Sequence, residues 1–515
     1  MKESLQAIAA CCSHCFLYIY CNTDQKKIYI YFSSHRYIII LHRELRLIGK
    51  GSDIMSILGA YIVPHPPVVV PEVGMGREAE IRRTIDAYEE ISRRIEEQDP
   101  ETLIVITPHA VMYSDYIHIS PGTKGRGSFS RFGAPHVSIE APYDAEMIAE
   151  LSEAAAAAGV AAGTLGEREK ELDHGVLVPL YFITKRLKHF QIVRVSTSGL
   201  TLEEHYRFGM CIRDTAEKLG RRTVIIASGD LSHRLCNDGP YSYAREGPDF
   251  DRQITCAMQT ADFMKFLAMD ENFCNAAGEC GLRSFVVMAG ALDRTSVDAE
   301  LLSYEGPFGV GYAICSYKPV AVDPDRNFLD RMKRSRSEKI ADIKSNEDPF
   351  VQLARRSLEH YVRSGSMLEL PDGLPAELTT ERAGVFVSLK KHRRLRGCIG
   401  TIAPTEDSIA MEIIKNAVSA GVGDVRFPVV TADELDELVY SVDVLSKPEH
   451  ISGKSELDVR KYGVIVSNGH RRGLLLPNLE SVTTIDEQVE IALHKAGISP
   501  ESHYAMERFE VVRHH

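Results

Sequence analysis

The stretch SILGAYIVPHPP, residues 56–67, is an apolar run rich in small and β-branched side chains that ends in Pro-His at His65. TLIVITPH, residues 102–109, has the same apolar, β-branched pattern and also ends in Pro-His, at His109. Between them, residues 77–98 carry apolar side chains at helical spacing, with charges elsewhere. A strand, a helix and a strand in close succession form a βαβ unit, whose crossover makes the two strands parallel. The stretch therefore predicts an α/β fold.

Alternating strands and helices extend this pattern to residue 318. Apolar runs predict strands at 190–197, 222–228 and 312–317, and helical spacing predicts helices at 145–158, 203–219, 249–269 and 280–292. We expect a largely parallel or mixed sheet covered by helices, in a domain that spans residues 55–318.

Length and composition limit the functions that the chain can have. A chain of 515 residues is too long for one ordinary core, so two or three domains are expected. The net charge of −12 argues against a nucleic-acid-binding protein, which usually carries a basic face. No run of 18 apolar residues predicts a membrane-spanning helix. Eleven thinly spread cysteines argue against a disulfide framework and favour a reduced, cytoplasmic compartment.

Residues 1–54 differ in composition from the rest of the chain. They hold four of the eleven cysteines and an aromatic, β-branched stretch, and the apolar residues are interrupted by charges. A signal peptide would need a continuous apolar run and a small-residue cleavage site. One interpretation is a membrane-associating or targeting leader. The interpretation that we prefer is an over-extended start, with Met55 as the true initiator.

Two further segments come after the first domain. Residues 319–348 are polar, charged and poor in apolar periodicity, so we interpret them as a linker. Residues 349–513 combine helices with strands joined by hairpin turns, which predicts an α+β domain.

Histidines gather at the predicted carboxyl edge of the first sheet, where ligands collect in parallel sheets. His65, His109 and His233 each follow an apolar strand, and His174 lies in a predicted loop before the apolar segment VLVPLYFI. Two imidazoles and one carboxylate are a donor set used for ferrous iron. The candidate acid is Glu279, at the start of an apolar helix. A carboxylate there could instead stabilise the helix N-terminus without any metal.

Together, the motifs PHPP, TPH, LDHGVLVPL, SGDLSH and the Glu-Cys-Gly segment resemble the LigB-like catalytic subunit of class III extradiol ring-cleavage dioxygenases. The neighbouring Memo family has a similar fold. The resemblance implies Fe(II) ligation by His65, His109 and Glu279. It also implies that His233 is an acid/base catalyst and that His174 contacts substrate or oxygen from outside the ligand set.

The resemblance implies a small aromatic diol and dioxygen as the substrates. A nearby imidazole would remove the second phenolic proton and later return it, a task suited to a group that titrates near neutral pH.

Cys280 offers a different interpretation of the same site. Its Cys-Gly pair resembles that of Memo proteins, and a thiolate would favour copper or redox-active iron over ring cleavage. Cys280 could equally be a small buried residue, as free cysteines often are.

The second domain resembles the AMMECR-type domain, through the motif LRGCIGT. Arg396 could bind an anion or a carboxylate, and Cys398 could be a nucleophile or a structural residue between two glycines. The two domains together resemble the AmmeMemoRadiSam group, which implies a radical-SAM protein as partner; we also expect a homo-oligomer. Three functions are therefore open: a non-haem iron oxidoreductase, a Memo-like metal-redox or metal-delivery protein, and an adaptor module.

Overall fold

The computed structural model describes residues 55–166, 168, 171–239, 241–392, 394–479 and 482–515, together with the backbone of three earlier strands. The chain divides into two compact units, Met1–Arg326 and Asn327–His515, and each is described by itself. Most of the predicted leader lies outside the described residues. The backbone described there forms one antiparallel sheet of β1 (Ala9–Cys12), β2 (Cys15–Asn22) and β3 (Lys27–Phe32).

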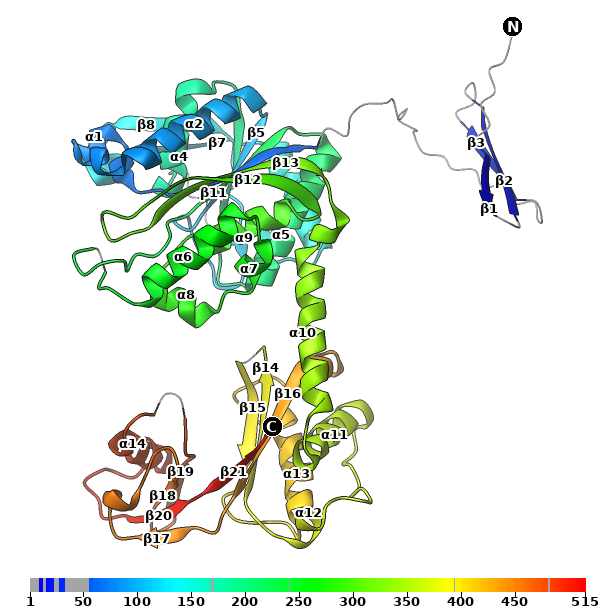
Figure 1. The fold of residues 1–515 in the computed structure, drawn as a ribbon, viewed down its shortest axis with the longest axis vertical. Coiled ribbons are helices and arrows are strands. Elements are labelled where there is room, and N and C mark those ends of the chain that lie inside the picture. The colour runs from blue at the N-terminus through cyan, green and yellow to red at the C-terminus, as the bar shows by residue number, and fades with distance from the viewer. Residues whose placement is uncertain are drawn as a thin grey trace. The chain divides into compact units, whose positions relative to one another are not determined.

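A six-stranded mixed sheet forms the centre of the first unit, in the order β10-β5-β11-β4-β13-β12. Figure 1 labels its strands β5, β11, β12 and β13. The four strands from β10 to β4 run parallel, and β13 and β12 add an antiparallel edge. This confirms the predicted α/β class. The strands are β4 (Ile57–Val63), β5 (Thr102–Thr107), β10 (Gln191–Ser196), β11 (Thr223–Ser228), β12 (Thr295–Glu305) and β13 (Tyr312–Val322).

Helices cover both faces of this sheet, because each central strand is apolar on both sides. Every residue of β5 and β11 is buried, so both faces need a covering layer. One layer holds α2 (Arg82–Gln98) and α4 (His174–Arg186), and the other holds α5 (Leu202–Leu219), α6 (Glu246–Gln259) and α9 (Leu282–Ala291). The remaining elements are α1 (Pro71–Gly74), α3 (Ala145–Ala157), α7 (Phe263–Leu267), α8 (Glu271–Ala277), β6 (Ile117–His118), β7 (Lys124–Phe129), β8 (Ala134–Pro142) and β9 (Ala162–Gly163).

Two local features differ from the sequence-based expectations, and the order of the sheet adds a third observation. His174 does not lie in a loop, because it is the first residue of α4, a helix that contains Pro179. The helix expected over 249–269 is broken into α6 and α7 at Ala261, whose φ of 48° is left-handed. The strands β4 and β5, which carry His65 and His109, are separated in the sheet by β11.

The second unit contains two four-stranded antiparallel sheets, which confirms its α+β class. The first sheet, β15-β14-β16-β21, packs against α11 and α13, and the second, β17-β20-β18-β19, packs against α14. The strands are β14 (Val385–Lys391), β15 (Arg394–Gly400), β16 (Leu438–Leu445), β17 (Glu449–Ile451), β18 (Gly463–Asn468), β19 (Arg471–Leu475), β20 (Ala505–Phe509) and β21 (Val511–His514). The helices are α10 (Phe328–Ser345), α11 (Pro349–Ser364), α12 (Ala376–Thr380), α13 (Ile409–Val422) and α14 (Ile485–Ala496).

The segment interpreted as a polar linker, 319–348, is mostly helical. Its helix α10 buries only Phe328 and Leu329, so its polar composition reflects a helix that is largely exposed. In the described part of the chain, no helix combines the length and apolarity needed to cross a membrane.

Candidate metal centre

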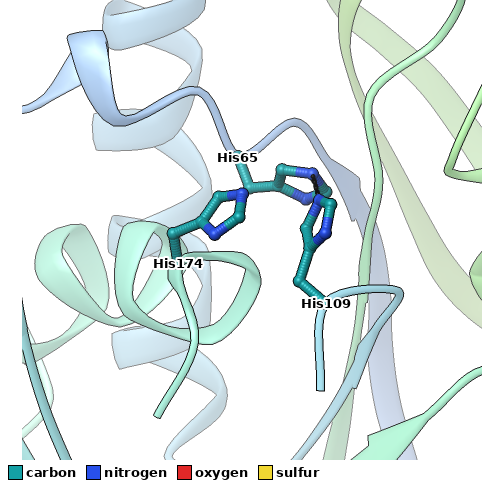
Figure 2. A group of neighbouring side chains, drawn as sticks. All are labelled: His65, His109 and His174. Carbon is teal, nitrogen blue, oxygen red and sulfur yellow. Dashed lines mark hydrogen bonds between the residues drawn. The ribbon is translucent and has the colours of Figure 1, made fainter. Parts of the chain in front are cut away.

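Three histidines converge at the carboxyl edge of the first sheet (Figure 2). His65 follows β4, His109 follows β5 and His174 begins α4. One ring nitrogen of each lies within 4.8 Å of those of the other two, and the Nε2 atoms of His65 and His109 are 2.9 Å apart. The ring of His174 stacks on that of His109, with centroids 4.2 Å apart. Residues from three distant parts of the chain therefore form one cluster of imidazoles.

The outer atoms of these histidines are held by neighbouring polar groups. The Nδ1 atom of His65 lies 2.9 Å from the Ser228 hydroxyl, at the end of β11. β11 lies between β4 and β5, so its last residue fills the space beneath the two imidazoles. The backbone N–H of His109 donates to the Thr107 hydroxyl at 3.1 Å. The contact with Ser228 involves a ring nitrogen and fixes the orientation of the His65 imidazole, whereas Thr107 holds only the backbone of His109.

The local electrostatics keep these imidazoles neutral. Burial lowers the pKa of His65 well below its usual value, and the adjacent His109 lowers it further. Burial lowers the pKa of His109 to about 4, with a further contribution from His174. Burial also lowers the pKa of His174. The neutral imidazole is the form that binds metal ions, so near pH 7 no proton has to leave these rings before an ion binds.

Asp230 and Cys280 lie directly beside His65, and sequence reasoning had not singled out Asp230. The Asp230 carboxylate accepts a hydrogen bond from the His65 backbone N–H at 2.8 Å. The Cys280 thiol lies 3.6 Å from His65 Nε2 and accepts from the Asp230 backbone N–H at 3.3 Å. Burial raises the pKa of Asp230 to about 7 and that of Cys280 well above its usual value. The signal for Asp230 is its place in SGDLSH, between a strand end and a histidine.

Two glycines bring Cys280 to this position. A Cβ atom at Gly229 would lie 2.2 Å from the Cα atom of Gly281, closer than atoms can approach. Glycine at position 229 therefore lets the loop after β11 touch the start of α9, whereas a Cβ atom at Gly281 would meet the ring of Phe285. The Asp230 backbone and the Cys280 thiol meet as a result.

Glu279, the predicted carboxylate ligand, lies at the start of α9. It is partly buried, and its Oε2 atom accepts a hydrogen bond from the Leu282 backbone N–H at 2.7 Å. Burial raises the pKa of Glu279, although this hydrogen bond opposes the effect. No hydrogen bond or ion pair joins it to the three clustered histidines in the described part of the chain. Its ligand role stays a prediction.

His233 lies close to the cluster but is not one of the three converging imidazoles. Burial lowers its pKa to about 4, with a further contribution from His109. Its Nε2 atom is buried without a hydrogen-bond partner among the described residues. Tyr241, half exposed, stacks on its ring, and Phe132 contacts the ring of His174 edge-on. Two aromatic rings from separate loops thus flank the two histidines that were predicted to act in catalysis.

Residues 59–315 match the protein family described as the catalytic LigB subunit of aromatic ring-opening dioxygenase, and residues 351–514 match AMMECR1. Protein CA_C1420 of Clostridium acetobutylicum is 44% identical over 468 residues, which cover 89% of this chain and 99% of that protein. The chain belongs to the LigB family. Its LigB domain is followed by an AMMECR1 domain.

Two further relatives match the AMMECR1 domain alone. A Thermotoga maritima protein is 53% identical over 153 residues, which are 30% of this chain and 88% of that protein. The solved structure of the uncharacterised protein PH0010 from Pyrococcus horikoshii is 35% identical, with a TM-score of 0.31, over 32% of this chain and 88% of that chain.

In the AMMECR1 domain, the two predicted site residues are held by other side chains. Arg396 forms an ion pair with Glu434 at 2.8 Å, which lowers the pKa of that carboxyl to about 2. The guanidinium therefore binds a carboxylate of its own chain. The Cys398 thiol accepts from the Ser388 hydroxyl at 3.2 Å, and its backbone N–H donates to Asp424. The role of Cys398 stays a prediction.

The LigB-domain cluster fits a metal ion. Two imidazole nitrogens bound to one divalent ion at roughly 2.1 Å can lie about 3 Å apart, close to the 2.9 Å between His65 and His109. Neutral imidazoles, of which His65 is buried and His109 is open to solvent, lie beside the Cys280 thiol and the Asp230 carboxyl group, and such groups are donors for a redox metal.

Proposed function

We propose that the LigB domain is a ferrous-iron-dependent oxidoreductase that acts on a catechol-like aromatic substrate with dioxygen. The observation that carries the proposal is the pair of neutral imidazoles, His65 and His109, whose Nε2 atoms face each other at 2.9 Å. When bound, the ion would supply a positive charge that favours the deprotonated diol and an electron path from the diol to dioxygen.

The chain's own residues have separate tasks in this proposal. His65 and His109 would hold the ion; Ser228 orients the ring of His65, and Thr107 holds the backbone of His109. His233 would accept a hydroxyl proton of the substrate, because its Nε2 atom is buried and makes no hydrogen bond among the described residues. Neutral imidazole is the form required of a base, and burial keeps His233 in that form near pH 7 by lowering its pKa to about 4. This pKa lies below the near-neutral value expected from the sequence for a group that also returns the proton.

Two aromatic rings would hold the substrate at the mouth of the site. Phe132 lies against His174, and Tyr241 lies against His233. Both rings are partly exposed, so each can bury apolar area against a planar ligand. The aromatic class of substrate is consistent with these flanking rings.

A second candidate function rests on Cys280. Its sulfur lies 3.6 Å from His65 Nε2, whereas Glu279 is hydrogen-bonded to the start of its own helix. A thiolate donor would favour a Memo-like metal-redox or metal-delivery role, with copper or iron and without ring cleavage.

The test is the metal content of purified variants. Under anaerobic conditions, the wild-type protein should hold about one iron per chain, and His65→Ala or His109→Ala should lose it. Glu279→Gln should lose the iron if the carboxylate is the third ligand, and Cys280→Ser should lose it if the thiolate is. Oxygen uptake with a panel of catechols then distinguishes ring cleavage from the Memo-like role. Stoichiometric metal in both histidine variants would refute the site.

A further inference from the structure

The carboxylate of Asp173 lies directly beneath the histidine cluster, although Asp173 is not one of its imidazoles. Its Oδ1 atom accepts a hydrogen bond from the Thr107 hydroxyl at 2.6 Å. The same hydroxyl accepts from the backbone N–H of His109 at 3.1 Å. Asp173 also immediately precedes His174 in the chain. The Asp173 carboxylate therefore contacts Thr107, which holds the backbone of His109, and its residue adjoins His174 in the chain.

Asp173 does not perform the usual task of a residue at its position. It is the N-cap residue of α4, and aspartate there normally accepts a hydrogen bond from the first turn of its own helix. The Asp173 side chain makes no such bond. By contrast, Asp144 caps α3 and accepts from the Met147 backbone N–H. The Asp173 carboxylate is used instead for the contact with Thr107.

A buried arginine lies near the other oxygen of the same carboxylate, in an ion pair without a hydrogen bond. Arg194 is 1% exposed, and its Nη1 atom lies 3.9 Å from Asp173 Oδ2. The guanidinium also donates to the Ser120 hydroxyl and to the Glu171 carbonyl, each at 2.6 Å. A buried cation of this kind fixes the position of the loop that ends in Asp173.

The packing leaves little freedom for this arrangement. A Cβ atom at Gly175 would lie 2.3 Å from the Thr107 hydroxyl and 2.9 Å from Asp173 Oδ1. The missing side chain at Gly175 is what lets the start of α4 approach the end of β5. The negative charge of Asp173 is close enough to both rings to raise the pKa of His109 and of His174, which partly offsets the lowering by burial.

We propose that Asp173 is a positioning residue of the metal centre, which sets the relative placement of His109 and His174 through Thr107 and Arg194. The inference rests on the proposed metal site. Outer partners of metal-binding histidines typically change metal affinity by roughly 10–100-fold when they are removed. Asp173 should therefore act on affinity and coordination geometry without binding the ion.

The chain contains a matched pair of control residues on the same strand. At the opposite end of β5, the Thr102 hydroxyl donates to the buried carboxylate of Asp144, at 2.5 Å. Thr102 and Asp144 thus reproduce the Thr107–Asp173 contact at the edge of the sheet that holds no clustered histidine. Thr102→Val reports the structural cost of losing such a contact, and Asp144→Ala adds to it the loss of the α3 N-cap and of the ion pair with Arg221.

The experiment compares Asp173→Ala and Thr107→Val with these two controls in the full chain. Binding of Fe²⁺ without oxygen and of Co²⁺ is measured by titration, and the visible spectrum of bound Co²⁺ reports its coordination. Asp173→Ala and Thr107→Val should weaken binding about 10–100-fold and shift the spectrum. The controls should lower the unfolding temperature but leave affinity and spectrum unchanged. Thr107→Val is nearly isosteric, so it tests the inference even if Asp173→Ala does not fold.

The outcomes separate the inference from the proposed function. A wild-type protein that binds neither ion would overturn the proposed function, and the inference with it. A wild-type protein that binds metal, alongside Asp173→Ala and Thr107→Val variants with unchanged affinity and spectrum, would overturn the inference alone. Equal losses of affinity in Asp144→Ala and Thr102→Val would show that the effect is only structural, which also overturns it.

Discussion

At the scale of single residues, the main question is which side chain completes the ligand set with His65 and His109. The pH dependence of metal affinity, compared between the wild-type protein and Cys280→Ser, distinguishes Cys280 from Asp230, whose carboxyl pKa of about 7 lies in the same range. Burial raises the pKa of the Cys280 thiol well above its usual 9.0, so the thiol holds its proton between about pH 6 and 8. Binding through this sulfur releases that proton, and affinity should then rise about tenfold for each unit rise in pH.

The imidazoles of the cluster should not make metal affinity depend on pH over this range. The pKa of His109 is lowered to about 4, and the pKa values of His65 and His174 are also lowered, so these rings are already neutral above about pH 6. Titrations at several pH values, with the released protons counted by calorimetry in two buffers, measure the slope. A slope that persists in Cys280→Ser would exclude the thiol as its source.

His233 provides a second prediction at this scale. His233→Gln should retain iron, because the ring is not among the three converging imidazoles. Turnover of a catechol that the wild-type protein oxidises should fall by roughly 10²–10⁴-fold, which is the usual contribution of a general acid or base. Iron quantification and single-turnover kinetics check both parts. Tyr243→Ala is a useful control, because Tyr243 lies in the same loop and is about half exposed, whereas Tyr241 stacks on His233. Loss of iron from His233→Gln would make this histidine a ligand.

At the scale of elements, the close contact between Gly229 and Gly281 supports the metal centre. Gly229→Ala would place a Cβ atom against the backbone of Gly281, so the loop after β11 has to move. Overpacking of this kind costs about 1–3 kcal/mol, and the displaced loop carries Asp230 and His233. We expect a lower unfolding temperature and weaker metal binding. Gly453→Ala is the control, since no atom lies within 4 Å of its Cβ position. Equal stability of the two variants would show that the loop adjusts freely.

The elements also show which parts of the fold could be predicted from the sequence. The buried strands β4, β5 and β11 were predictable because each is a continuous apolar run that ends in a polar motif. The helix α4 was not predicted, because Pro179 and the apolar run around it do not give a clear helical pattern. The strand β12 was missed because its residues are mostly half-buried, so neither face gives a strong alternation.

The site was predictable only in part, for a physical reason. Strand ends identify His65 and His109 because the residues that come directly after parallel strands gather at the carboxyl edge of the sheet. Contacts that join distant loops, such as Asp173 with Thr107 or Cys280 with His65, have no local pattern. They arise from the order of strands in the sheet, which periodicity does not specify.

At the scale of the whole molecule, the metal centre uses residues of the first unit alone. His65, His109 and His174 come from β4, β5 and α4, and the second unit buries an apolar core of its own. We therefore expect residues 55–326, produced alone, to bind iron with the same stoichiometry and affinity as the full chain. Residues 327–515 alone should fold and bind none. Anaerobic titration and thermal unfolding of the three proteins measure this.

A chain that starts at Met55 and continues to His515 separates two explanations if residues 55–326 fail to bind iron. If this longer chain binds iron normally, the AMMECR1 domain is needed for the metal centre, which would contradict a site formed by one unit. If the longer chain also fails, residues 1–54 are needed, and the prediction that the folded protein begins at Met55 is wrong. Equal affinity in all the chains that contain residues 55–326 is the expected result, because every histidine of the cluster and each of its hydrogen-bonding partners lies between those limits.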